Sequence, residues 1–292
     1  MKTYPKWLSA AVLSAMLASP AAALETKAKN VILMDYDTGE YLFAENAFVP
    51  VAPASMSKLM TVYVLFSKLK DGTLSLEDVF SVSENAWRTG GAASGSSTMF
   101  LPIGSKVTVE NLIKGIIIQS GNDACIVAAE NIAGSEEDFA ELMNAKAKEL
   151  GLKNSHFVNS TGLPHPDHRM SAEDLARLAQ ALIRDFPEYY SVFSQKSFTY
   201  NNILQGNRNP LLYSMPDADG LKTGHTAEAG FCLTASVKRG DRRLIGVMTG
   251  LKSNKERSEE AEKLMNWGFR EFNNYKVFKQ FQRIVSVPVY MG

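Results

Sequence analysis

The sequence predicts an α/β fold of the α+β type, in which helices flank an antiparallel sheet and an all-helical lobe is inserted into the chain. Three observations support this prediction. Strand-like runs occur early, at 31–44, and again between 221 and 248, where no helix separates them. Helical periodicity dominates the chain between 108 and 182. A final amphipathic pattern at 253–272 supplies a helix that can pack across the sheet.

The first 23 residues have the order of a secretory signal peptide. Lys2 and Lys6 precede the apolar stretch 7–18, and a small-residue site from Ala21 to Ala23 follows. An apolar stretch this short does not span a bilayer, which takes about 20 residues. We therefore expect cleavage after Ala23 and a periplasmic location.

The composition is that of a soluble globular protein, with 45% hydrophobic and 21% charged residues in a chain of 292. Without 1–23 and its two lysines, acidic residues slightly outnumber basic ones, so nothing argues for nucleic acid as a partner. Cys125 and Cys232 both lie in apolar surroundings. Export would allow a disulfide, but two buried free thiols are the interpretation that we favour.

The first element of the exported chain is predicted to be a β-hairpin, with strands at 31–34 and 41–44. A linker with two prolines then leads into a helix from Ser55 to about Lys70. The small, polar, glycine-rich stretch 89–97 has no hydrophobic period and predicts a loop. Such a long loop inside a compact domain more often has a function than serves only as a connection.

Helices are predicted over 108–150, with Ser120-Gly121-Asn122 between them and Ser135 as the cap of the second. A further helix begins at Ser171, whose hydroxyl can cap it while Asp174 reaches back to the cap. The residues that this helix should bury are Leu175, Leu178, Ala179 and Leu182.

The late strands are expected at 221–224, 231–237 and 243–248, and the short turns between them favour an antiparallel meander. The last helix opens with a capping box from Ser253 to Glu256. Its apolar face comprises Ala261, Leu264, Met265, Gly268, Phe269 and Phe272. A last strand is predicted from Ile284 to Tyr290.

A hydroxyl and an amine, on Ser55 and Lys58, lie three residues apart at the start of an apolar run. Residues i and i+3 of a helix are neighbours, so this is a nucleophile beside a possible base. A second copy, Ser67-Lys68-Leu69-Lys70, follows. A capped helix with a solvated lysine explains either copy as well, so the choice depends on the rest of the chain.

Two further short motifs follow in order, Ser120-Gly121-Asn122 and Lys222-Thr223-Gly224. Ser83-Glu84-Asn85 has the same Ser-x-Asn pattern as the first of these motifs, whereas the second motif has no other copy. The triple, with Asp at the centre of its middle motif, is known from class A β-lactamases and penicillin-binding proteins. Here Gly121 replaces that Asp.

The sequence resembles the low-molecular-weight D-alanyl-D-alanine carboxypeptidases, peptidase family S11, over nearly the whole chain after residue 23. The near-verbatim family segments are 53–61, 119–125, 219–226 and 229–231. The resemblance implies a β-lactamase/transpeptidase-like fold with a D,D-peptidase domain at 24–283. It also implies that 284–292 is the first strand of a truncated C-terminal β domain, and that the helix which anchors relatives to the inner membrane is missing.

The implied activity is that of a serine-type D-Ala-D-Ala carboxypeptidase. Ser55 attacks the carbonyl of the penultimate D-alanine, and Lys58 accepts its proton. Lys58 must be neutral for this, and both burial and the positive charge of Lys222 should lower its pKa. Ser120 is expected to bridge the two lysines and relay the proton to the departing D-alanine. Asn122 is expected to orient Lys58 and the substrate amide.

The resemblance also implies how substrate is held. Backbone N–H groups of Ser55 and His225 form the oxyanion hole, and the strand with the third motif pairs with the extended substrate. Arg257, at the first turn of the last helix, matches a family arginine that binds the terminal carboxylate, and Thr223 assists it. Arg208 matches a second family arginine near the site.

The implied partners are peptidoglycan stem peptides ending in D-Ala-D-Ala, with β-lactams as covalent inhibitors and no cofactor. We expect no metal, because His165 to His168 has neither a helical frame nor an evident third ligand. A D,D-endopeptidase, a β-lactamase and a catalytically silent peptidoglycan-binding protein are the alternatives. The stretch 156–171 contains no glutamate to activate a deacylating water, which disfavours the β-lactamase. The intact motifs disfavour the silent protein.

Overall fold

The computed structural model describes residues 24–275. The expected signal peptide at 1–23 and the expected strand at 284–290 lie outside these residues. A five-stranded antiparallel sheet has the order β2-β1-β9-β8-β7, which confirms the predicted hairpin and meander. Its strands are β1 (Asn30–Asp35), β2 (Tyr41–Glu45), β7 (Ala218–Thr226), β8 (Gly230–Arg239) and β9 (Arg242–Leu251).

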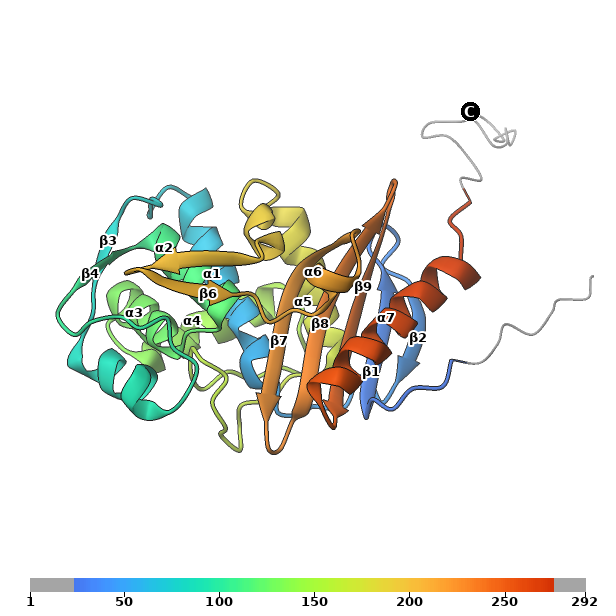
Figure 1. Cartoon of the computed structure of the whole chain (residues 1–292), viewed down its shortest axis with the longest axis horizontal. Helices are drawn as coiled ribbons and strands as arrows, with labels where there is room; N and C mark the ends of the chain where they lie inside the picture. Colours follow the sequence, from blue (N-terminus) through green and yellow to red (C-terminus); the bar gives the residue numbers. More distant parts are fainter. Residues whose placement is uncertain (1–23, 276–292) are drawn as a thin grey trace, which may run out of the picture.

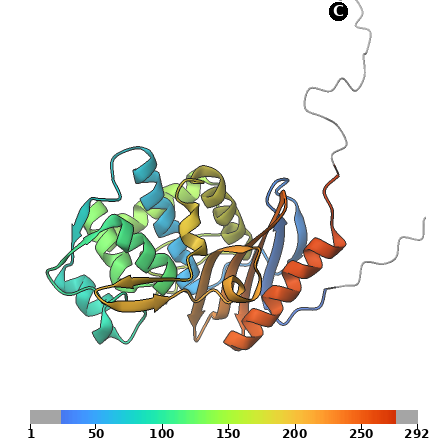
Figure 2. The same cartoon turned by 45° about the horizontal axis from the view of Figure 1, so that its top comes forward.

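Helices cover both faces of this sheet, as Figures 1 and 2 show. The last helix, α7 (Asn254–Glu271), packs on β8 and β9, while α5 (Ala172–Asp185) packs on the opposite face against β1 and β9. Successive side chains of a strand point to opposite faces, so Val31 joins the α7 core and Ile32 the core under α5. The fold prediction of helices flanking an antiparallel sheet is confirmed.

The helical lobe stands beside the sheet (Figure 1). It contains α1 (Lys58–Lys70), α2 (Val109–Lys114), α3 (Asn122–Ala133) and α4 (Glu136–Glu149). Helix α1 runs through its centre and contacts α3, α4 and α5, so most of its side chains are buried. A helix buried on nearly all sides needs no polar face, which explains its continuous apolar run.

Several short elements were not predicted. They are the 3-10 turn η1 (Ala54–Ser57) before α1, the π-helical turns η2 (Ala86–Gly90) and η4 (Gly115–Gln119), the 3-10 turns η3 (Ala92–Ser94) and η5 (Tyr190–Ser194), the pair β3 (Val79–Ser81) and β4 (Lys106–Thr108), the pair β5 (Ser197–Tyr200) and β6 (Ile203–Gly206), and α6 (Leu211–Ser214). The predicted loop 89–97 is therefore only partly correct, because η2 extends into its start and η3 lies within it.

The three predicted helix caps are confirmed, since the hydroxyls of Ser135, Ser171 and Ser253 each accept a backbone N–H three residues on. The prediction that the side chain of Asp174 bonds back to the cap residue Ser171 is wrong. Its carboxylate instead accepts hydrogen bonds from the backbone N–H of Asn154 and the hydroxyl of the next residue. These donors come from a loop that is distant in the sequence, and they occupy the carboxylate in place of the backbone N–H of Ser171.

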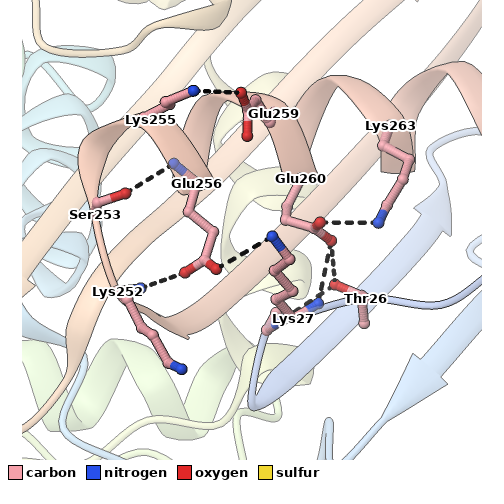
Figure 3. Close-up of polar contacts among 10 residues, drawn as sticks. Thr26, Lys27, Lys252, Ser253, Lys255, Glu256, Glu259, Glu260 and Lys263 are labelled. Carbon is pink, nitrogen blue, oxygen red and sulfur yellow. Dashed lines mark hydrogen bonds and ion pairs between the residues drawn. The ribbon is translucent and has the colours of Figure 1, made fainter.

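The first described residues contact α7 through a hydrogen bond and an ion pair (Figure 3). The hydroxyl of Thr26 donates to Glu260 at 2.9 Å, and Lys27 lies 3.7 Å from Glu256. Glu260 also pairs with Lys263 at 2.8 Å. Because Glu256 and Glu260 belong to the first half of α7, these contacts hold that half of the helix in place beside β1.

Both cysteines, Cys125 and Cys232, are free and buried, as we favoured. Among residues 24–275, none of the helices is long and apolar enough to cross a membrane.

Candidate active site

The three motifs come from separate parts of the fold and meet at one cleft. Ser55 lies in η1, directly before α1, which begins at Lys58. Ser120 directly follows η4, and the third motif lies on β7, which packs against η1. The cleft has a volume of about 340 Å³, and its lining residues are Ser55, Ser97, Ser120, Arg208, Thr223, Gly224, His225, Phe231, Asn254 and Arg257.

The amine of Lys58 is fully buried and has three hydrogen-bond partners. It lies 3.0 Å from the hydroxyl oxygen of Ser55 and 2.7 Å from the side-chain oxygen of Asn122. Its third partner is the backbone carbonyl of Thr161, at 2.5 Å. The orienting contact expected of Asn122 is therefore present. Thr161 was missed, because any residue can supply a backbone carbonyl and the sequence carries no signal for it.

Burial lowers the pKa of Lys58 from 10.5 to about 8. The positive charge of Arg208 lowers it as well, while Glu136 and Asp123 raise it. Lys222 is also buried, and burial followed by repulsion from Lys58 lowers its pKa well below the ordinary value. Lys222 also interacts with Lys58, because repulsion between the two amines is one of the causes that lower the pKa of Lys222.

Ser120 has a left-handed backbone, with φ 65° and ψ 31°, which is rare outside glycine and costs about 1–3 kcal/mol. Its hydroxyl is buried and has no hydrogen-bond partner among the described residues. The amine of Lys222 donates to the carbonyl of Thr223 at 3.1 Å. The expected bridge from Ser120 to the two lysines is thus not formed in this structure, although the hydroxyl does line the cleft.

Asn122 ties the middle motif to the loop at 89–97. Its side-chain N–H donates to the hydroxyl of Ser96 at 2.9 Å, and its backbone N–H donates to the carbonyl of Ser97 at 2.7 Å. The neighbouring Asp123 accepts from Thr98 and from two backbone N–H groups beyond it. The loop was predicted to be functional, and it lines the cleft through Ser97.

Gly224 shows why the third motif ends in glycine. A Cβ added there would lie 3.0 Å from the carbonyl oxygen of Pro53 and 3.1 Å from the Cβ of Ala54. The absence of a side chain therefore lets β7 lie directly against the turn that carries Ser55. The next residue, His225, stacks on Phe231 with ring centroids 4.0 Å apart at the cleft wall.

Arg257 and Arg208 place two guanidinium groups in the cleft. Arg257 is buried and donates to Asn254 at 2.9 Å, and burial lowers its pKa to about 10. Its Nε has no partner in the described part of the chain. Arg208 lies at the exposed rim and donates to the hydroxyl of Ser97 at 2.6 Å. Neither arginine forms an ion pair within residues 24–275, so both can receive an anion.

Metal-binding groups are not found in the region that the structure describes, where no three His, Cys, Asp or Glu side chains gather. His168 is buried, and burial lowers its pKa to about 4. Its Nδ1 accepts the backbone N–H of Val158 at 3.2 Å. It is therefore a neutral structural residue of the loop.

The chain is similar to several known proteins. The chain is 48% identical to the D-alanyl-D-alanine carboxypeptidase DacC of Escherichia coli K12 over 263 residues, which cover 89% of this chain and 66% of that protein. It is 44% identical to DacA of the same strain, covering 91% and 66%. Penicillin binding protein 5 from Haemophilus influenzae has a similar structure, with a TM-score of 0.86 and 40% identity over 90% of this chain and 76% of that one.

A Streptomyces K15 DD-transpeptidase variant also matches, with a TM-score of 0.79 and 26% identity over 85% of this chain and 100% of that one. The chain spans slightly less than two thirds of the length of DacC and DacA. The sequence model described as D-alanyl-D-alanine carboxypeptidase matches residues 16–253. The chain therefore belongs to the D-alanyl-D-alanine carboxypeptidase family, peptidase S11.

Proposed function

We propose that this protein is a serine-type D-Ala-D-Ala carboxypeptidase that removes the terminal D-alanine from peptidoglycan stem peptides. The observation that carries the proposal is the 3.0 Å contact between the Ser55 hydroxyl and the buried amine of Lys58. A serine hydroxyl becomes a useful nucleophile when a base accepts its proton. A lysine whose pKa is lowered to about 8 can be that base near neutral pH.

The partners of Lys58 favour this direction of proton transfer. A neutral amine has two N–H donors and one lone pair. The side-chain oxygen of Asn122 and the carbonyl of Thr161 can only accept, so they take the two N–H groups. The lone pair then faces the one partner that can donate, the Ser55 hydroxyl.

Acylation then follows in two parts. The Ser55 oxygen bonds to the carbonyl carbon of the penultimate D-alanine while its proton passes to Lys58. The bond from that carbon to the terminal amide nitrogen then breaks, and the nitrogen takes a proton and leaves as D-alanine. The Ser120 hydroxyl lines the cleft and has no hydrogen-bond partner among the described residues, so it is free to turn and relay this proton. Water hydrolyses the ester and restores Ser55.

Substrate positioning uses the rest of the cleft. The substrate backbone extends along β7 at Lys222 to Gly224, and the N–H groups of Ser55 and His225 stabilise the oxyanion. Arg257 binds the terminal carboxylate with help from Thr223, since its guanidinium is buried without a carboxylate partner among the described residues. Arg208 lies near enough to affect the pKa of Arg257 and supplies a second positive charge.

The proposal also covers the inhibitors of the protein, its cellular location and its domain organisation. A β-lactam acylates Ser55 and is released slowly, so β-lactams inhibit the enzyme. The protein acts in the periplasm after cleavage of 1–23, with a D,D-peptidase domain at 24–283 and with 284–292 as the start of a further β domain. Any attachment to the inner membrane is then peripheral.

The test is to label the purified protein with penicillin and to measure D-alanine released from a pentapeptide ending in D-Ala-D-Ala. Trypsin cuts after lysine, so Ser55 lies before the cut at Lys58 and Ser67 lies between the cuts at Lys58 and Lys68. We expect the adduct mass on the peptide with Ser55. An adduct on the peptide with Ser67, or no adduct and no D-alanine, overturns the proposal. Rapid release of hydrolysed penicillin would indicate a β-lactamase instead.

A further inference from the structure

The carbonyl that Lys58 meets belongs to a tight turn, Asn159–Gly162. The side-chain oxygen of Asn159 accepts the backbone N–H of Thr161 at 3.1 Å and of Gly162 at 2.7 Å. It also accepts the hydroxyl of Thr161 at 3.0 Å. Gly162 has φ +79°, and a Cβ there would lie 2.1 Å from the carbonyl oxygen of Ala54. The turn is thus shaped internally by Asn159 and packs directly on the turn that carries Ser55.

Its residue Ser160 is held from two sides. The backbone N–H and the hydroxyl of Ser160 donate to one oxygen of Glu136, at 3.2 and 2.6 Å. Its carbonyl accepts the hydroxyl of Thr61, at 2.6 Å. Glu136 is the first residue of α4, and Thr61 lies three residues after Lys58 on α1. Two rigid helices therefore fix the residue next to the carbonyl of Thr161.

We propose that Glu136 is a positioning residue for acylation: by holding Ser160, its carboxylate keeps the carbonyl of Thr161 on the amine of Lys58, so that the lone pair of that amine faces Ser55. This inference rests on the proposed function, because it concerns how the base is aimed. If the turn moves, the amine loses an obligate acceptor and is free to rotate. Displacements of about 1 Å at a reacting group can cost up to about a hundredfold in rate.

Glu136 has a second effect through its charge, because a carboxylate near Lys58 favours the protonated amine. The other titratable or charged groups that interact with Lys58 are Cys125, Asp123, Arg208, Lys222 and His168. Asp123 also raises the pKa of Lys58, but its carboxylate is bonded to the loop that starts at Thr98. Glu136 is the carboxylate that a chain of hydrogen bonds joins to the Thr161 turn. Substitutions of Glu136 can therefore separate the effect of its hydrogen bonds to Ser160 from the effect of its charge on Lys58.

The experiment measures the second-order rate constant of penicillin acylation against pH for wild type and four variants. Glu136→Ala removes both the acceptor and the charge, Glu136→Gln keeps an acceptor oxygen without the charge, and Ser160→Ala keeps the charge but removes one donor. Glu137→Ala is the matched control, because Glu137 is the next residue of α4 and is exposed, and within residues 24–275 it makes no hydrogen bond or ion pair to the turn. Thermal melting checks the fold of each variant.

For Glu136→Ala we expect a loss of about ten- to a hundredfold in the plateau rate constant. Glu136→Gln should recover most of that loss while moving the pH midpoint down by about half a unit. Ser160→Ala should lose rate severalfold with the midpoint unmoved, and Glu137→Ala should match wild type. A purely structural role does not predict rescue by Gln together with a shifted midpoint.

The inference is overturned if Glu136→Ala acylates like wild type, or if Glu136→Gln loses as much as Glu136→Ala with no shift. If neither Glu136 variant folds, Ser160→Ala decides, and a wild-type rate constant there overturns the inference. Wild type decides the proposed function separately, because that proposal fails if Ser55 is not labelled in the unaltered protein.

Discussion

The two ends of helix α1 carry the same spacing of serine and lysine and differ in nearly everything else. At its start, the amine of Lys58 is fully buried and contacts Ser55, Asn122 and Thr161. At its end, the hydroxyl of Ser67 donates back to the carbonyl of Tyr63 at 2.8 Å. The amine of Lys70 is exposed there and donates to the carbonyl of Asp185 at 2.6 Å.

The difference shows that the spacing alone provides no chemistry. At the start of α1, the adjoining turn and two distant segments supply the partners of the buried amine, and burial lowers its pKa. At the end of the helix the serine satisfies its own turn and the lysine remains in solvent. The following substitutions and conditions test this contrast, from the largest expected effect to the smallest.

The largest effect is expected when the nucleophile is removed. Ser55→Ala should abolish covalent labelling by penicillin and release of D-alanine, because no other hydroxyl at the cleft contacts Lys58 in the described structure. Ser67→Ala should leave both unchanged. Intact-protein mass after penicillin treatment measures the labelling. A labelled Ser55→Ala protein would show that the two ends of α1 had been assigned wrongly.

Removal of the base should cost somewhat less. Lys58→Met should lower the acylation rate constant by about a thousandfold, within the range that general base catalysis contributes. Lys70→Met is the matched control at the exposed end and should acylate at the wild-type rate. Stopped-flow measurement with a chromogenic β-lactam gives both constants. Equal losses in the two variants would contradict the contrast.

Acidification should act on the buried lysine in a predictable direction. The pKa of Lys58 is lowered to about 8, so the amine is protonated and unable to accept a proton below that pH. The acylation rate constant should therefore rise about tenfold per pH unit up to about pH 8 and then level off. A profile that is flat from pH 6 to 9 would rule out Lys58 as the base. Lys70→Met should not move the midpoint.

Pushing β7 away from the start of α1 should have a moderate effect. Gly224→Ala places a Cβ 3.0 Å from the carbonyl oxygen of Pro53, so the strand must shift by a few tenths of an ångström. We expect a loss of about tenfold in acylation rate with a modest change in melting temperature. A variant that acylates like wild type would show that β7 need not touch the Ser55 turn.

Glycine beyond the other end of α1 should matter only for stability. Gly72 has φ +76° with nothing within 4 Å of an added Cβ. Gly72→Ala should cost about 1 kcal/mol through backbone strain alone. Chemical denaturation measures this cost, and the acylation rate should stay at the wild-type value. A loss of rate here would mean that strain at one end of α1 reaches the other.

Sequence patterns predicted most of the fold, because the main strands and helices are long and have clear apolar periods. They also predicted which side chains meet at the cleft, through three motifs with a recognisable order. They failed where tertiary contacts decide. The carboxylate of Asp174 bonds to the Asn154 loop and not back to its cap residue, and within residues 24–275 the Ser120 hydroxyl makes no bridge between the lysines.

The contacts that were missed have a common physical cause. Thr161 contributes a backbone carbonyl, and Ser96 and Ser97 contribute loop contacts to Asn122 and Arg208. None of these has a side-chain pattern at a fixed spacing, since a loop brings them in from more than 20 residues away. The link from Glu136 to Ser160 is of the same kind. Such contacts follow from how loops pack, which local sequence does not encode.

The lining of the cleft also governs how fast a substrate arrives. Among the described residues, no Asp or Glu lines it, whereas Arg208 and Arg257 do. A concave surface with charges of one sign attracts oppositely charged molecules before contact and accelerates their association. Anionic peptide ends should therefore be captured faster at low ionic strength, and added salt should slow capture by screening. Peptides whose carboxyl end is amidated lack that charge, and their association should depend little on salt.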